Sequence, residues 1–168
     1  MTAAVVIFAV GNPSRGDDAL GPALMAQISA WLEGSEQAEL FELIEDFQLQ
    51  IEHALDLRGR DLALFIDAGS GTPAPYHFGP VAAVDRIGHS THALAPGSVL
   101  EVYREMEGSA PPPAFTLCLA GKSFELGAPL TAEAESHLAA TFGFVQELLV
   151  NPDAAYWTSR CDARPLSG

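Results

Sequence analysis

The chain has 168 residues, of which 48% are hydrophobic and 18% charged, and this composition is typical of one globular domain with a sizeable core. Its formal net charge of -14 opposes binding to nucleic acid and to anionic membranes, although much of such a charge serves solubility. Cys118 lies in an apolar run and Cys161 in a polar segment, so neither a disulfide framework nor a thiolate metal site is indicated.

The first predicted element is a buried strand at Val5–Val10, which is short, rich in β-branched residues and bounded by glycine. Residues 11–13 have turn chemistry, and a helix is expected from about 18 to 32 because leucine and isoleucine recur there at helical spacing. Asp17 and Asp18 therefore lie between the carboxyl end of a strand and the amino end of a helix. Open α/β sheets bind ligands at such positions.

The remaining elements alternate between strands and helices. We expect a strand at 38–44, a short helix at 48–57, a second buried strand at 62–66, a hairpin or edge strand at 76–84, a helix at 97–107, a last strand at 115–120 and a long helix at 131–150 with Thr131 as its N-cap. Residues after Asn151-Pro152 carry no periodicity, which predicts an extended tail.

These elements predict an α/β fold, a three-layer α/β/α sandwich with a mostly parallel central sheet. Residues 1–150 would form a single domain and residues 151–168 the extended tail. The strands at 5–10 and 62–66 are apolar on both faces and should be central. Asp67 follows the second of them, so Asp18 and Asp67 should meet at one edge of the sheet.

The spacing of Gly11 and Gly16 nearly matches that of a phosphate-binding loop, but two carboxylates follow where Lys and Ser or Thr would stand. Carboxylates repel phosphate and attract cations, so the loop suits a metal ion or a protonated group. The alternative is that one aspartate caps the helix and the other is solvated, and the motif alone leaves these two interpretations about equal.

The chain resembles the nickel-iron hydrogenase maturation endopeptidases, which trim a C-terminal extension from the hydrogenase large subunit after nickel insertion. The resemblance covers nearly the whole chain and depends on the order and spacing of several short motifs. They are Gly11-Asn12 with Asp17-Asp18-Ala19-Leu20-Gly21, Ile66-Asp67-Ala68, the His92-Ala93-Leu94-Ala95-Pro96 segment, Gln48-Leu49 with Glu52, and Phe124-Glu125-Leu126-Gly127.

The resemblance implies that Asp18, Asp67 and His92 gather around a metal as its ligands and as the catalytic residues. The family often has glutamate at the position of Asp18, and Asp17 is adjacent, so which of the two coordinates stays open. His89 has the same ligand chemistry as His92, and only the resemblance selects between them.

Two carboxylates and one imidazole form a mixed oxygen and nitrogen site that suits nickel, zinc or a similar divalent ion. Three protein ligands leave positions open, so nickel would arrive with the substrate protein and no cofactor would be tightly bound. Gln48 and Glu52, one helical turn apart, are either a solvated pair or residues that orient the peptide.

The sequence thus predicts a peptidase that acts on a nickel-containing hydrogenase precursor. The alternatives are a non-enzymatic metal-binding maturation chaperone and a metal-assisted hydrolase of a small molecule. The first apolar run is too short to span a bilayer and has no basic segment before it. We therefore expect a cytoplasmic monomer whose partner is the large-subunit precursor, without nucleic acid or membrane binding.

Overall fold

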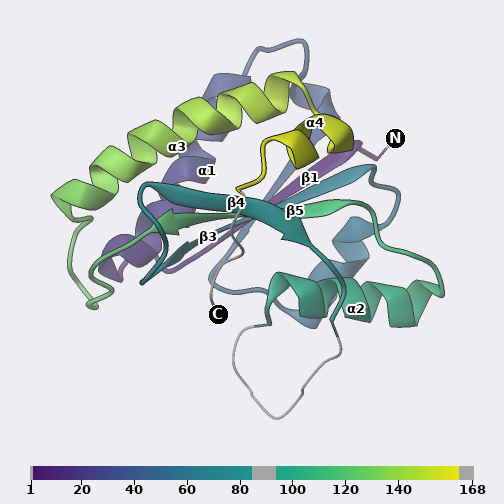
Figure 1. The fold of residues 1–168 in the computed structure, drawn as a ribbon, viewed down its shortest axis with the longest axis horizontal. Helices are drawn as coiled ribbons and strands as arrows, with labels where there is room; N and C mark the ends of the chain where they lie inside the picture. Colours follow the sequence, from purple (N-terminus) through teal and green to yellow (C-terminus); the bar gives the residue numbers. More distant parts are fainter. Residues whose placement is uncertain (1, 85–93, 163–168) are drawn as a thin grey trace.

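A five-stranded sheet with helices on both faces forms the centre of the molecule (Figure 1), in a computed structural model that describes residues 2–84 and 94–162. The strands are β1 (Val5–Val10), β2 (Phe41–Asp46), β3 (Leu62–Gly69), β4 (Tyr76–Val81) and β5 (Ala114–Ala120). The helices are α1 (Leu20–Leu32), α2 (Pro96–Glu107), α3 (Ala132–Val150) and α4 (Ala154–Ser159), with short 3-10 helices η1 (Gly16–Ala19), η2 (Ala38–Leu40) and η3 (Ile51–Leu57).

The strand order is β2-β1-β3-β5-β4, and every neighbouring pair is parallel except β4 with β5. The predicted α/β class with a mostly parallel sheet is therefore confirmed. Strands β1 and β3 lie inside the sheet, as their two apolar faces indicate. The chain runs from β1 outward to β2 and then returns past β1 to β3. The direction of winding thus reverses between β1 and β3, at the topological switch point where ligands bind in such sheets.

One face of the sheet, which we call the α3 face, is covered by α1, α3 and α4. Alternate strand residues such as Ile7, Leu64 and Leu117 pack there against the helices in one buried cluster. Figure 1 shows α1 and α3 side by side over this face. Because both helices contribute long apolar side chains, the cluster is the larger of the two hydrophobic cores.

The opposite face, which we call the cavity face, is covered by η3 and α2. Phe8 and Phe65 belong to this second cluster, together with Leu57 of η3 and Leu100 of α2. In Figure 1, α2 lies across the sheet from α1 and α3, so helices flank both sides. The predicted three-layer arrangement is present in the described part of the chain.

The predicted boundaries differ from the observed ones in three places near the N-terminal half. Residues 38–40 form the 3-10 helix η2, and the strand that was expected at 38–44 runs instead from 41 to 46. The expected helix at 48–57 is a 3-10 helix at 51–57. Strand β3 continues to Gly69, so Asp67 lies within the strand. The later helices and strands agree closely, including the edge strand β4 and the Thr131 N-cap of α3.

The predicted extended tail at 151–168 contains a helix in its described part, up to residue 162, and residues 163–168 lie outside the described residues. Residues 154–159 form α4, and Trp157 within it is fully buried and donates a hydrogen bond from Nε1 to the Leu148 carbonyl at 2.9 Å. Farther along, the Phe78 amide donates to the Asp162 carboxylate, and the Asp162 amide donates to the Phe78 carbonyl. Six residues are too few for a periodic pattern, and the local signal for this helix is its N-cap Asp153, whose side chain accepts a hydrogen bond from the Tyr156 amide. No helix among the described residues is long and apolar enough to cross a membrane.

Candidate functional site

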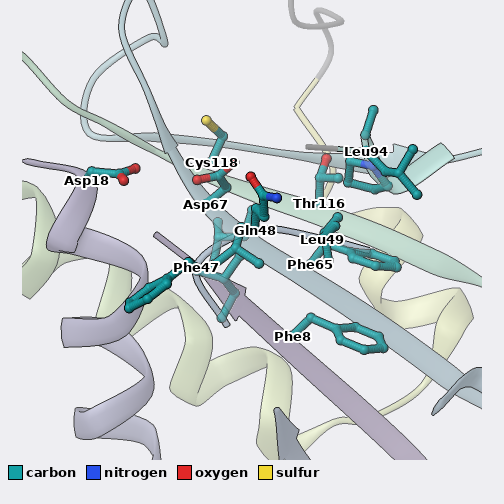
Figure 2. A pocket seen from close by; sticks show the side chains of 15 residues that line it. Phe8, Asp18, Phe47, Gln48, Leu49, Phe65, Asp67, Leu94, Thr116 and Cys118 are labelled. Atoms are coloured by element: carbon teal, nitrogen blue, oxygen red, sulfur yellow. The ribbon is translucent and has the colours of Figure 1, made fainter. Parts of the chain in front are cut away.

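A cavity of about 530 Å³ opens at the carboxyl ends of the central strands, on the cavity face. Its polar lining includes Asp18, Asp67 and Cys118, and Figure 2 shows these three side chains along one side of it. Phe8 and Phe65 lie on the other side in the same view. The cavity therefore occupies the switch point between β1 and β3, where the sequence predicts a site.

Asp18 is positioned by the tight turn that follows β1. The Asn12 backbone amide donates a hydrogen bond to Asp18 Oδ2 at 2.7 Å, which fixes the carboxylate beside the end of the strand. Gly11 has a φ of 149°, and a Cβ at this position would lie 2.1 Å from the Asp18 carbonyl oxygen. Only glycine permits this close approach, so the glycine before the motif sets the location of Asp18.

Asp67 lies near the end of β3, and its carboxyl group faces that of Asp18 (Figure 2). The side chain is exposed at the cavity mouth, yet desolvation by the surrounding protein raises the pKa of the Asp67 carboxyl to about 6. A hydrogen bond from the Ala68 amide lowers this pKa in part, whereas the negative charge of Asp18 raises it further. The two carboxylates thus repel one another, and a cation between them would relieve that repulsion.

Asp17 has a different role from its neighbour. Its side chain is fully buried, and its two oxygens accept hydrogen bonds from the backbone amides of Lys122, Ser123 and Thr131 and from the Thr131 hydroxyl. Burial by itself would raise the pKa of the Asp17 carboxyl, but these four hydrogen bonds outweigh it and lower the pKa. Asp17 therefore joins the β1–α1 loop to the β5–α3 connection, and of the two aspartates only Asp18 lines the cavity.

Cys118 and Thr116 also line the cavity, and the sequence analysis did not select either of them. Cys118 pairs with Asp67 in the β3–β5 register, and its Sγ lies 3.2 Å from the Thr72 hydroxyl. Burial raises the pKa of the Cys118 thiol, the Thr72 contact lowers it in part, and the negative charge of Asp67 raises it again. The group is therefore a neutral thiol at neutral pH and a poor nucleophile.

The signal for these two residues was present in β5. Thr116 and Cys118 alternate with the fully apolar Phe115, Leu117 and Leu119, and this period of two indicates a strand with one less-buried face. The sequence alone does not show that this less-buried face of β5 borders a cavity. Both cysteines in the chain are free, as expected.

The apolar side of the cavity is formed by rigid aromatic packing. Phe8 of β1 pairs in register with Phe65 of β3, and their rings stack with centroids 4.9 Å apart and an interplanar angle of 11°. The His53 ring contacts the Phe8 ring edge-on at 5.6 Å. Both phenylalanines are nearly fully buried, so this floor is part of the core as well as of the cavity.

His92, the third residue of the predicted site, lies outside the described residues, as does His89. Leu94, Ala95 and Pro96, which follow His92 in the sequence, line the cavity. Gln48 lines it as well, whereas Glu52 is exposed on η3 and does not. Within residues 2–84 and 94–162, no group of three or more His, Cys, Asp and Glu side chains is arranged to hold a metal ion. Asp18 and Asp67 are thus the described members of the predicted ligand set.

Comparisons with known proteins find structural relatives only. No protein-family model matches the sequence, and no curated protein matches it. Among solved structures, the hydrogenase maturating endopeptidase HybD from E. coli aligns with a TM-score of 0.65 and 20% identity, over 88% of this chain and 93% of that chain. The nickel-iron hydrogenase maturation protease HycI from Thermococcus kodakarensis KOD1 aligns with a TM-score of 0.62 and 22% identity, over 89% and 94%.

The chain has the fold of the nickel-iron hydrogenase maturation proteases. A hydrogenase 2 maturation peptidase from a Thaumarchaeota archaeon adds a third example, with a TM-score of 0.59, 19% identity and coverage of 87% of this chain and 97% of that chain. The alignments cover 93–97% of these three relatives. At these identities the likeness concerns the backbone, and the chemistry depends on the residues described above.

Proposed function

We propose that this chain is an endopeptidase that removes a C-terminal extension from the nickel-loaded large subunit of a nickel-iron hydrogenase. One observation supports the proposal: Asp18, in the 3-10 helix that follows β1, and Asp67, near the end of the adjacent strand β3, present facing carboxylates in one cavity at the switch point of a maturation-protease fold. The resemblance of the sequence motifs to the maturation endopeptidases implies that the same two residues, with His92, recognise the metal of the substrate.

The carboxylate pair supports a substrate that carries the metal. Desolvation is the main cause of the raised pKa of Asp67, and the negative charge of Asp18 adds to it, so the two carboxylates repel one another. A divalent nickel ion in the precursor would relieve this repulsion, so binding would favour the loaded precursor over the empty one. Two carboxylates and one imidazole, without a thiolate, form a modest site, and we infer that the protein holds no metal tightly by itself.

Peptide hydrolysis requires an activated water molecule and a polarised carbonyl, and nickel in the substrate can contribute to either. Asp18 and Asp67 would position the loaded precursor so that the bond to be cut lies at the cavity mouth. The Cys118 thiol, neutral and hydrogen bonded to Thr72, is a poor candidate for attack on that bond.

The test is incubation of the protein with nickel-loaded and nickel-free precursor, followed by mass spectrometry of the precursor. We expect the loaded precursor alone to lose a C-terminal peptide. Asp18→Asn, Asp67→Asn and His92→Ala should each slow this loss by roughly 100-fold or more, because each removes a group that holds the substrate metal. A chaperone would bind the loaded precursor without shortening it, and a small-molecule hydrolase would do neither.

Asp61→Asn is the matched control for these variants. Asp61 is an exposed aspartate at the opposite end of the same strand as Asp67, next to the residue where β3 begins. It carries the same charge but lies away from the cavity, so the variant should process loaded precursor at the normal rate. Equal loss in Asp61→Asn and Asp67→Asn would show that net charge, rather than the carboxylate pair, determines activity.

A further inference from the structure

The central cavity has a polar mouth and an apolar interior, and the carboxylate pair accounts only for the mouth. Beside Asp18 and Asp67 the lining includes the stacked rings of Phe8 and Phe65, the aliphatic side chains of Leu49 and Leu94, and the polar side chains of Gln48 and Thr116. At about 530 Å³ the cavity is within the range of pockets that enclose an organic ligand. A metal ion and its ligands at the mouth would leave this interior unfilled.

Phe47 is an exposed aromatic residue that borders the same cavity. It follows β2, lines the cavity and still exposes 69% of its surface, the largest exposed fraction among the large hydrophobic residues described. A phenylalanine so exposed beside an apolar cavity gains stability only when another apolar group covers it. The Phe47 ring thus supplies exposed apolar surface to a cavity whose other aromatic residues, Phe8 and Phe65, are almost fully buried.

We propose that this apolar interior is the specificity pocket of the site and binds the hydrophobic side chain of a substrate residue next to the cleaved bond. The inference rests on the proposed function. The occupant follows from adjacency, because a peptide whose scissile bond lies at Asp18 and Asp67 places its neighbouring side chain at the cavity entrance. The two carboxylates at the mouth repel acidic side chains, and the exposed Phe47 ring favours apolar ones.

The pocket can be tested without any precursor, by titration with N-acetyl amino acid amides monitored by backbone amide NMR. The amides of leucine and phenylalanine should shift the signals of Leu94, Thr116 and Cys118, and should bind at least about 10-fold more tightly than the amide of glutamate. Shifts of equal size for all amides, or shifts confined to other parts of the protein, would overturn the proposal.

Phe47→Ala and Leu126→Ala form a matched pair of variants for this titration. The two residues are almost equally exposed, at 69% and 67%, but only Phe47 lines the cavity. Phe47→Ala should weaken binding of the phenylalanine amide roughly 3- to 10-fold, whereas Leu126→Ala should leave it unchanged. Equal effects of the two substitutions would mean that general surface hydrophobicity, and not the pocket, binds the probe.

Processing then tests the role of the pocket in selecting the substrate. Nickel-loaded precursors with leucine, alanine or aspartate on either side of the cleaved bond are compared by kcat/KM. At one of the two positions we expect leucine to exceed alanine by about 10-fold and aspartate by more, and Phe47→Ala should reduce the leucine-to-alanine ratio to about 2. Leu126→Ala should leave that ratio unchanged.

The outcomes separate the two proposals. Cleavage of all precursors at equal rates would overturn the specificity pocket and leave the proposed function in place. If no precursor is cleaved by the wild-type protein, the proposed function fails, and the amide titration still decides whether the pocket binds apolar side chains.

Discussion

The two faces of the sheet use the same strands but differ at their carboxyl ends. On the α3 face, Leu119 at the end of β5 is fully buried under the helices. Its neighbour Cys118, on the cavity face, remains partly exposed and lines the cavity beside Asp67. Packing residues and cavity-lining residues therefore alternate along the end of β5. Substitutions on the α3 face should therefore reduce stability, and substitutions at the cavity mouth should change activity with little effect on folding.

The largest expected effect comes from Trp157→Ala on the α3 face. Trp157 is fully buried, contacts the rings of Phe78 and Phe115 edge-on, and hydrogen bonds to the Leu148 carbonyl. Its removal leaves a cavity in the core and should lower the free energy of unfolding by about 3–5 kcal/mol, measured by urea denaturation. Trp31→Ala, which truncates a partly buried tryptophan, should cost less, about 1 kcal/mol. If the two variants were equally stable, α4 would not be part of the core.

Asp17→Asn and Asp18→Asn should separate stability from activity at two adjacent positions, because Asp17 is buried and Asp18 lines the cavity. The buried Asp17 carboxylate accepts four hydrogen bonds, from three backbone amides and one hydroxyl. The side-chain NH2 group of asparagine would face some of these donors and could not accept from them. We expect Asp17→Asn to lower the free energy of unfolding by about 2–3 kcal/mol, and Asp18→Asn to change it by less than 1 kcal/mol while it stops processing.

The pH dependence of stability provides a control for Asp17. Its pKa is lowered on folding, so its stabilising contribution is fully present above the ordinary value of 3.8 and is lost as the pH falls through the lower folded-state value. The difference in melting temperature between wild type and Asp17→Asn should therefore shrink on acidification below about pH 4. A difference that stays constant down to pH 2 would argue against the charge as its source.

Asp67→Asn should give the smallest effect, in the opposite direction. The pKa of Asp67 rises to about 6 on folding, so its ionisation opposes folding, and stability is lost as the pH rises from about 4 through 6. Asparagine removes this loss and should stabilise the protein at pH 7, by less than about 1 kcal/mol because solvent screens the exposed carboxylate. Melting temperatures between pH 4 and 7 test this, and a variant less stable than wild type at pH 7 would contradict it.

The sequence was sufficient for the parts of the fold that have strong local patterns. The unbroken apolar run at 5–10 predicted an interior strand, and Thr131 predicted the start of α3, because burial on both faces and helix capping leave local signatures. The end of the chain was missed because α4 is short and gains its stability from the burial of Trp157, which is a tertiary contact.

The candidate site could be predicted only in part. Asp18 and Asp67 were found because strand ends on a parallel sheet meet at one edge. The distinction between Asp17 and Asp18 could not be made, since the partners of Asp17 lie more than 100 residues away in the sequence. Phe47 and Cys118 were missed for a related reason: no local pattern tells which side chains of a strand end or loop border a cavity. His92 lies outside the described residues, and its role stays a prediction.

The docking of the β1–α1 loop on the β5–α3 connection has a consequence for engineering. The Gly16 and Asp17 amides donate to the carbonyls of Ala128 and Ser123, and the Gly127 amide donates back to the Ser14 carbonyl. The scaffold that holds Asp18 in register therefore depends on residues more than 100 positions away in the sequence. A library intended to alter substrate preference should randomise residues 47 and 48 at the cavity mouth and keep Gly16, Asp17 and Gly127, which make these contacts, intact.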